Sequence, residues 1–159
     1  MLFELVVHVV RRLAVCGALA LALSNVSAAS AAPAAAPGLQ VASLAEQYVG
    51  SPYRWGGASP AGFDCTGFVM WIYGQFGVDL PHTEAGQLAS GTPVDADELQ
   101  PGDILVFANT YRGGLSHVGV YVGNGRFVHA MDEAHGVIVS NLWDGYWSPR
   151  LVGAARPIG

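Results

Sequence analysis

Cys65 is the residue of this chain whose type and surroundings point most directly to chemistry. It is the only cysteine beyond an apolar N-terminal run that contains Cys16. Without that run, Cys65 has no partner for an intramolecular disulfide, so it is a buried inert thiol, a link to another chain, or a reactive thiol. Thr66 and Gly67 follow it, rather than apolar residues, and this favours a reactive thiol over a core position.

The expected secondary structure around Cys65 also favours reactivity. Apolar residues at helical spacing predict a buried helix over residues 65–76, with Asp64 as its N-cap. The dipole and the free N–H groups at a helix start favour the thiolate, which is the attacking form, and can hold an oxyanion. If a cationic imidazole also pairs with Cys65, its alkylation should remain fast well below about pH 8.

A cysteine nucleophile needs an imidazole that takes and returns a proton, and His117 and His129 are the candidates. They lie on two predicted strands, 116–122 and 126–130, which a glycine-rich turn connects. A loop centred on Gly123 would place His117 directly opposite His129. A two-residue turn at Gly123-Asn124 would shift the register by one and put the histidines on opposite faces. We expect the loop centred on Gly123.

In that arrangement His117 is the general base, and His129 orients it through a hydrogen bond between ring nitrogens. Each histidine alone is more simply interpreted as structural, and Cys65 with two histidines is also a possible zinc ligand set. The sequence lacks any Cys-x-x-Cys or His-x-x-x-His pair, so catalysis ranks above zinc, and we expect no metal or cofactor. His82 is expected at the surface or at a cleft rim and His135 in a turn, and both are expected to be structural or solvated.

The remaining elements predict an α+β fold. A Ser-x-x-Glu capping box at 43–46 predicts a first helix over about 44–49, and a short helix is expected over 84–89. Residues 58–63 are expected to be loop. Strand patterns follow at 104–107, 116–122, 126–130, 136–140 and 151–156. This order indicates N-terminal helices packed on a small antiparallel sheet or barrel.

The N-terminus differs in composition from the rest of the chain. Arg11 and Arg12 precede an apolar run at 13–23, and small residues follow, so residues 1–32 are predicted to be a signal peptide. The run is short for a bilayer, which disfavours a stable membrane anchor. Residues 33–42 are expected to be a linker and 43–159 one domain. The formal net charge of −5 argues against nucleic acid as a partner.

Six motifs in order make the domain recognisable. They are 52–57 (PYRWGG), 63–68 (FDCTGF), 80–83 (LPHT), 101–107 (PGDILVF), 116–121 (SHVGVY) and 127–130 (FVHA). Together they resemble the NlpC family of cell-wall cysteine peptidases over nearly all of residues 43–156. The resemblance implies a papain-like core and a Cys-His-His triad of Cys65, His117 and His129.

The resemblance also implies a substrate. Family members cut stem peptides of bacterial peptidoglycan between D-glutamate, through its γ-carboxyl, and a diamino acid. The residues implied to bind that substrate are Tyr53, Asp64, Thr66 and Ser116. Two positions depart from the family pattern: Thr66 replaces a serine, and His82 replaces an arginine and so loses a permanent charge.

The sequence therefore predicts a secreted cysteine endopeptidase that acts on peptidoglycan stem peptides. We expect a monomer located in a periplasm, in the cell wall or outside the cell. One alternative is the same triad acting on another amide or acyl bond. Another is a non-catalytic wall-binding or hydrolase-regulating module, against which the intact triad argues.

Overall fold

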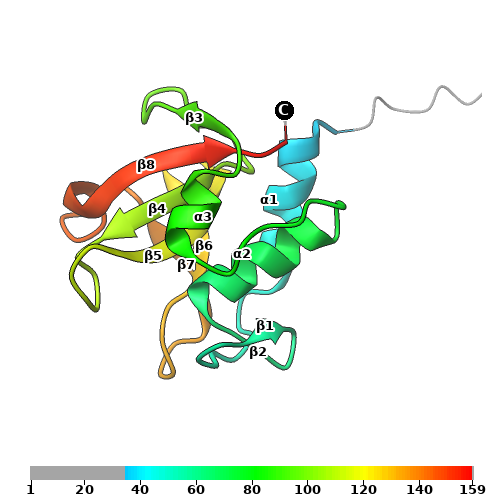
Figure 1. Ribbon diagram of the computed structural model, residues 1–159, viewed down its shortest axis with the longest axis vertical. Coiled ribbons are helices and arrows are strands. Elements are labelled where there is room, and N and C mark those ends of the chain that lie inside the picture. Colours follow the sequence, from blue (N-terminus) through cyan, green and yellow to red (C-terminus); the bar gives the residue numbers. More distant parts are fainter. Residues whose placement is uncertain (1–34, 159) are drawn as a thin grey trace, which may run out of the picture. The chain divides into compact units, whose positions relative to one another are not determined.

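The computed structural model describes residues 35–158, which are organised around a six-stranded antiparallel sheet (Figure 1). Its strands are β3 (Thr92–Val94), β4 (Ile104–Ala108), β5 (Leu115–Gly123), β6 (Arg126–Ala130), β7 (Val137–Asn141) and β8 (Leu151–Arg156). Their order across the sheet is β3-β8-β4-β5-β6-β7. A separate small hairpin pairs β1 (Ala58–Ser59) with β2 (Gly62–Phe63).

Three α-helices pack on this sheet. They are α1 (Pro37–Gln47), α2 (Cys65–Gly74) and α3 (Glu84–Leu88), and a 3₁₀ turn, η1 (Ser148–Arg150), leads into β8. Helices α1 and α2 contact each other and β5, while α3 contacts β4, β5 and β8. The α+β class expected from the sequence is therefore confirmed.

The two faces of the sheet carry two separate apolar clusters, because side chains alternate along each strand. On what we call the helix face, Val106, Val118 and Val128 pack with Phe68 and other residues of α1 and α2. The opposite face, which we call the aromatic face, is built from a second set: Leu105, Phe107, Tyr121, Phe127, Leu142, Trp147 and Ala154. Cys65 belongs to the helix-face cluster.

Helix α1 differs from the expectation. It begins at Pro37 rather than at residue 44, so residues 37–42 of the expected linker are helical, and Ser43 lies inside the helix instead of capping it. The N-cap is Ala36, which makes no side-chain cap. Proline suits the first helical turn, and Val41 and Ala45, four residues apart, are both fully buried. Burial of this face outweighs the local capping signal.

Two short features were not predicted. Residues 58–63, expected as loop, form the β1–β2 hairpin, and β3 pairs with β8 at residues 92–94. Strands of two or three residues carry too few side chains to show an alternating pattern. The other strands lie within one or two residues of their expected positions.

The predicted signal peptide, residues 1–32, lies outside the described residues. Between residues 35 and 158, no helix is both long and apolar enough to cross a membrane.

Candidate active site

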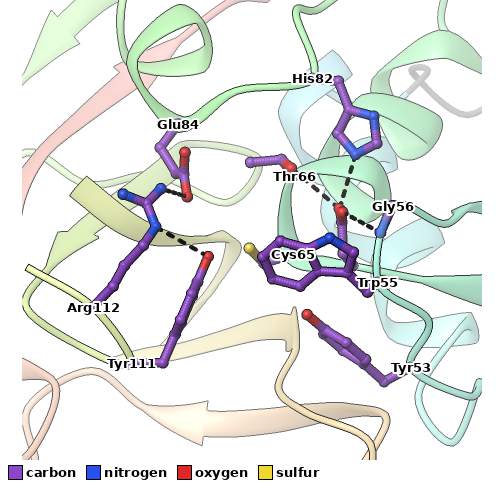
Figure 2. Close-up of a pocket in the computed structure, with 10 residues that line it drawn as sticks. Tyr53, Trp55, Gly56, Cys65, Thr66, His82, Glu84, Tyr111 and Arg112 are labelled. Atoms are coloured by element: carbon purple, nitrogen blue, oxygen red, sulfur yellow. Dashed lines mark hydrogen bonds and ion pairs between the residues drawn. The ribbon is translucent and has the colours of Figure 1, made fainter. Parts of the chain in front are cut away.

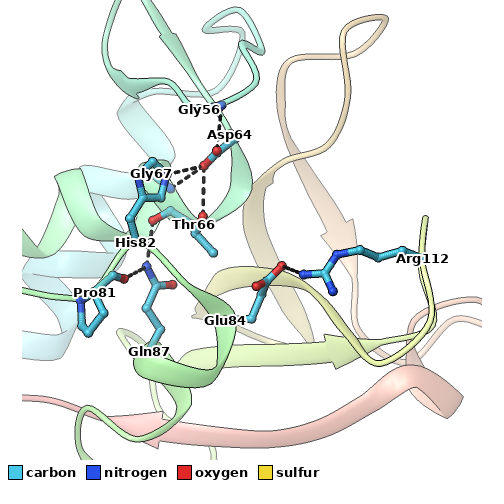
Figure 3. Close-up of polar contacts among 9 residues, drawn as sticks. All are labelled: Gly56, Asp64, Thr66, Gly67, Pro81, His82, Glu84, Gln87 and Arg112. Carbon is cyan, nitrogen blue, oxygen red and sulfur yellow. Dashed lines mark hydrogen bonds and ion pairs between the residues drawn. The ribbon is translucent and has the colours of Figure 1, made fainter.

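The carboxylate of Asp64 organises the start of α2, and with it Cys65 (Figure 3). Its Oδ1 accepts hydrogen bonds from the Gly67 N–H at 2.6 Å and from the Thr66 hydroxyl at 3.1 Å. The Nε2 of His82 lies 2.9 Å from the same oxygen, and the Gly56 N–H donates to Oδ2 at 2.9 Å. One side chain thus joins the helix start to two loops, and the N-cap expected from the sequence is confirmed.

Cys65 lies at a pocket of about 360 Å³ (Figure 2). The thiol belongs to a residue that is only 5% exposed. Three of the four residues expected to bind substrate line this pocket: Tyr53, Asp64 and Thr66. The other lining residues are Trp55, Gly56, His82, Glu84, Tyr111 and Arg112.

Ser116, the fourth expected substrate-binding residue, does not line the pocket. It is fully buried, and its hydroxyl accepts from the Thr110 N–H at 3.0 Å and lies 2.8 Å from the Thr110 hydroxyl. It therefore supports the loop between β4 and β5. The family resemblance implied a cleft residue here, but alternation along β5 turns the side chain of Ser116 into the interior.

That supported loop reaches across the pocket through two residues that the sequence did not single out. Arg112 pairs with Glu84 of α3 at 2.7 Å, and the ring of Tyr111 meets the edge of Trp55 at a centroid distance of 6.2 Å (Figure 2). Trp55 is 70% exposed. No local pattern marks loop residues of this kind, because only the folded chain brings them to the same pocket.

Gln87 is a third residue that the sequence did not reveal. Its side chain is fully buried, and its Nε2 donates to the carbonyl oxygens of Thr66 at 2.8 Å and Pro81 at 2.9 Å (Figure 3). The amide thus ties α3 to the first turn of α2, one residue after Cys65.

The two histidines meet on the aromatic face. Their rings are both buried, and His117 Nε2 lies 2.7 Å from His129 Nδ1. Rings of the aromatic cluster enclose them: Phe127 stacks on His129 at 4.6 Å, and Trp147 lies 5.2 Å from His117. The predicted contact between the two imidazoles is confirmed.

The route to that contact differs from the expected one. The hairpin turn contains two residues, Asn124 and Gly125, both with positive φ, so the loop centred on Gly123 is wrong. A bulge between Tyr121 and Gly123 adds one more residue to β5. The bulge shifts the register by one position, and this returns both histidines to the same face.

The histidines are diagonal neighbours rather than directly opposite. Val120 pairs with Val128 at the end of the ladder, and the same register continued by one residue brings Gly119 opposite His129. A Cβ on Gly119 would lie 2.7 Å from Cδ2 of Phe127 and 3.0 Å from Cβ of His129. The missing side chain leaves the room in which the diagonal contact forms.

Cys65 approaches the same strand from the helix face. The ladder between β5 and β6 extends from the turn only as far as Val120 and Val128. Beyond that pair, α2 packs on β5, and the backbone of Val118 is close enough to Cys65 to lower the pKa of its thiol. The thiol therefore lies against β5 at the residue next to His117.

Burial controls the charge state of the site. Burial first, and then the charges of Asp64 and Glu84, raise the pKa of Cys65, while the backbones of Val118 and Thr66 lower it, and together they place it at about 12. The resting thiol is therefore protonated. This desolvation opposes the preference for the thiolate that we expect from the helix start.

The same cause acts on the histidines. Burial lowers the pKa of His117 to about 4. For His129, burial and the neighbouring His117 lower the pKa well below its usual value. Both imidazoles are neutral at neutral pH, so His117 is free to accept a proton.

The other two described histidines lie where the sequence placed them. His82 lines the pocket rim and contacts Asp64. His135 is exposed and pairs with Asp132 at 2.7 Å in the turn between β6 and β7. Within residues 35–158, no group of three or more His, Cys, Asp or Glu side chains is arranged to hold a metal ion.

Comparison with known proteins agrees with this geometry. The model of the NlpC/P60 family matches residues 50–156. This chain belongs to the NlpC/P60 family. The family is one of hydrolases that are cysteine peptidases.

Relatives and solved structures extend the match. The gamma-DL-glutamyl hydrolase of Bacillus subtilis (strain 168) is 40% identical over 128 residues, which is 79% of this chain and 31% of that protein. An NlpC/P60 family protein from Bacillus cereus superposes with a TM-score of 0.72 and 31% identity, over 77% of this chain and 40% of that one. The peptidoglycan hydrolase RipB of Mycobacterium tuberculosis gives a TM-score of 0.64 and 29% identity, over 77% of this chain and 65% of that one. The chain thus spans under a third of the length of the Bacillus subtilis hydrolase.

Proposed function

We propose that this protein is a cysteine endopeptidase that hydrolyses γ-D-glutamyl amide bonds in the stem peptides of peptidoglycan. The observation that carries the proposal is a lone thiol at the start of α2, at an open pocket, against the strand that bears a buried His117–His129 pair. Membership of the NlpC/P60 family supports it. A gamma-DL-glutamyl hydrolase and a peptidoglycan hydrolase among the similar proteins support the substrate.

Cys65 is the nucleophile in this proposal, and His117 is its base. Nε2 of His117 is engaged by His129, so Nδ1 is the nitrogen left to take a proton. Because thiol and imidazole are both neutral at rest, the proton moves to His117 as the sulfur attacks the amide carbonyl carbon.

The negative oxygen of the tetrahedral intermediate then needs hydrogen-bond donors. The backbone N–H groups at the start of α2 are one source. Tyr53 is a second: its burial and the nearby Cys65 and Asp64 raise the pKa of its hydroxyl, which stays protonated and able to donate. Figure 2 shows this hydroxyl pointing into the pocket.

Collapse of the intermediate breaks the amide bond. The imidazolium of His117 gives its proton to the leaving amine, and the acyl group remains on Cys65 as a thioester. Water then attacks the thioester while His117 takes its proton, and that proton returns to the sulfur as the carboxylic acid leaves. His129 holds the ring of His117 in place through both steps.

The charges around the pocket are suited to a peptide that carries carboxylates. Arg112 brings a permanent cation to the rim, where it pairs with Glu84. A substrate carboxylate can replace Glu84 as its partner, because both residues border the pocket. Asp64 and Thr66 line the floor near Cys65. The predicted signal peptide would bring the domain to this extracytoplasmic substrate.

Digestion of defined peptidoglycan tests the proposal. The purified protein should release fragments cut between D-glutamate and the diamino acid, as identified by mass spectrometry, and Cys65→Ala should release none. Equal release by the variant would refute thiol catalysis. Cleavage at another bond would refute the assigned specificity. Sedimentation with intact peptidoglycan, without any release, would favour the wall-binding module.

A further inference from the structure

Ser140 continues the line of polar side chains that starts at His117. The Nε2 of His129 lies 2.8 Å from the hydroxyl oxygen of Ser140 on β7. Ser140 pairs with Phe127 across the ladder, so it is a diagonal neighbour of His129, as His129 is of His117. Three adjacent strands therefore contribute one polar group each to a continuous chain of hydrogen bonds.

The direction of these hydrogen bonds is fixed by the chemistry required of His117. When His117 has accepted the thiol proton, both of its nitrogens carry hydrogen, and its Nε2–H donates to Nδ1 of His129. Neutral His129 must then carry its own hydrogen on Nε2. That N–H points at Ser140, whose oxygen is the acceptor.

The opposite direction would disable the base. If the Ser140 hydroxyl donated to Nε2 of His129, the hydrogen of His129 would lie on Nδ1 and donate to His117. His117 would then carry its hydrogen on Nδ1, the nitrogen that must accept from Cys65. Because Ser140 is only half-buried, its hydroxyl hydrogen can reach water while its oxygen accepts.

We propose that Ser140 is a positioning residue, which accepts the Nε2–H of His129 and thereby fixes both histidines in the tautomer that lets His117 act as base. This rests on the proposed role of His117. Ser140 itself touches no reacting atom. Its effect passes through His129. The ring of His129 is fully buried, and among the described residues only Ser140 forms a hydrogen bond with its Nε2.

Kinetics of three variants give the first test. Ser140→Ala should lower kcat about tenfold with KM unchanged, because a buried N–H loses its acceptor. Ser140→Thr keeps a hydroxyl on the same strand and should restore most of kcat. Ser59→Ala, which removes an exposed serine on β1, should match the unaltered protein. An unchanged kcat in Ser140→Ala, or an equal loss in Ser140→Thr, would overturn the inference.

A spectroscopic readout separates this inference from the proposed function. Nitrogen-15 NMR of the histidine rings distinguishes protonated from unprotonated nitrogens, and Cys65→Ala protein allows it without turnover. We expect Nε2–H tautomers for His117 and His129, and a shift towards Nδ1–H when Ser140→Ala is added. The same tautomers in both proteins would overturn the inference, even if stem peptides are cleaved. A tautomer shift in a protein that cleaves no stem peptide would uphold it and refute the proposed function.

Discussion

The two faces of the sheet bring their catalytic candidates to the site in different ways. On the helix face, Cys65 is positioned by a local signal, the Asp64 cap three residues before the amide it binds. On the aromatic face, His117 and His129 meet only because of a bulge and a missing side chain at Gly119. The position of a residue at a helix start depends on its near neighbours in the sequence. The face on which a strand residue lies depends on the pairing register of the whole strand, and a shift of one residue reverses it.

The two faces nevertheless impose the same electrostatic condition. Both lie in apolar clusters, so the thiol and the imidazoles are each kept neutral. A neutral thiol and a neutral imidazole carry no charge at rest, so the proton must pass from Cys65 to His117 while the sulfur attacks the substrate. Burial is thus the largest influence on the pKa of the thiol and of both imidazoles.

The largest expected effect concerns the resting charge on the helix face. Since the pKa of Cys65 is raised from 9.0 to about 12, its thiolate fraction at neutral pH is about 1,000-fold below that of an unshifted thiol. Alkylation of Cys65, followed by mass spectrometry of its peptide, should rise about tenfold per pH unit from about pH 6 to pH 10. The denatured chain, as control, should react much faster at pH 7. A plateau in the alkylation rate below pH 7 would instead identify a thiolate–imidazolium pair in the folded protein. It would contradict the conclusion that both faces of the sheet keep their ionisable groups neutral.

The second effect tests the register of the aromatic face. Gly119→Ala places a Cβ 2.7 Å from Phe127 and 3.0 Å from His129, so it should separate the histidines and lower kcat about 100-fold. It should also destabilise the fold by about 1–3 kcal/mol through overpacking. Both are measured by peptide cleavage and denaturant unfolding. Gly145→Ala, where nothing lies within 4 Å of the added carbon, is the control and should leave both quantities unchanged. Full activity in Gly119→Ala would show that the diagonal contact does not depend on that space.

The smallest effect tests the local signal on the helix face. Asp64→Ala removes the acceptor for Gly67 and Gly56 and should lower the free energy of unfolding by about 1–2 kcal/mol. Thr83→Ala removes the corresponding cap of α3, whose side chain accepts from Gly86 at 3.2 Å, and is the comparison. We expect a smaller loss for Thr83→Ala, because Asp64 serves four donors and Thr83 one. Equal losses in denaturant unfolding would show that the additional contacts of Asp64 contribute nothing to stability.

Particular residues show how far sequence reasoning extends. The cap at Asp64, the short helix after Thr83 and the strand 126–130 lie where local patterns put them. The start of α1 does not, because buried Val41 and Ala45 extend the helix beyond its local signal. The roles of Ser116 and Ser140 were also not predictable. Which hydroxyl faces the histidines depends on strand pairing, not on proximity in the chain.

The sequence by itself determined the chemical groups and the family pattern: one cysteine beyond the predicted signal peptide, at a helix start, two histidines on a hairpin and six ordered motifs. Only the tertiary structure decided how those groups meet. The bulge after Tyr121 sets which face His117 and His129 share, and the loop between β4 and β5 brings Arg112 to Glu84 of α3. Burial, which exists only in the folded chain, decides that Cys65 rests as a thiol. The physical reason is that helix caps act over three or four residues, while register and desolvation depend on contacts across the whole domain.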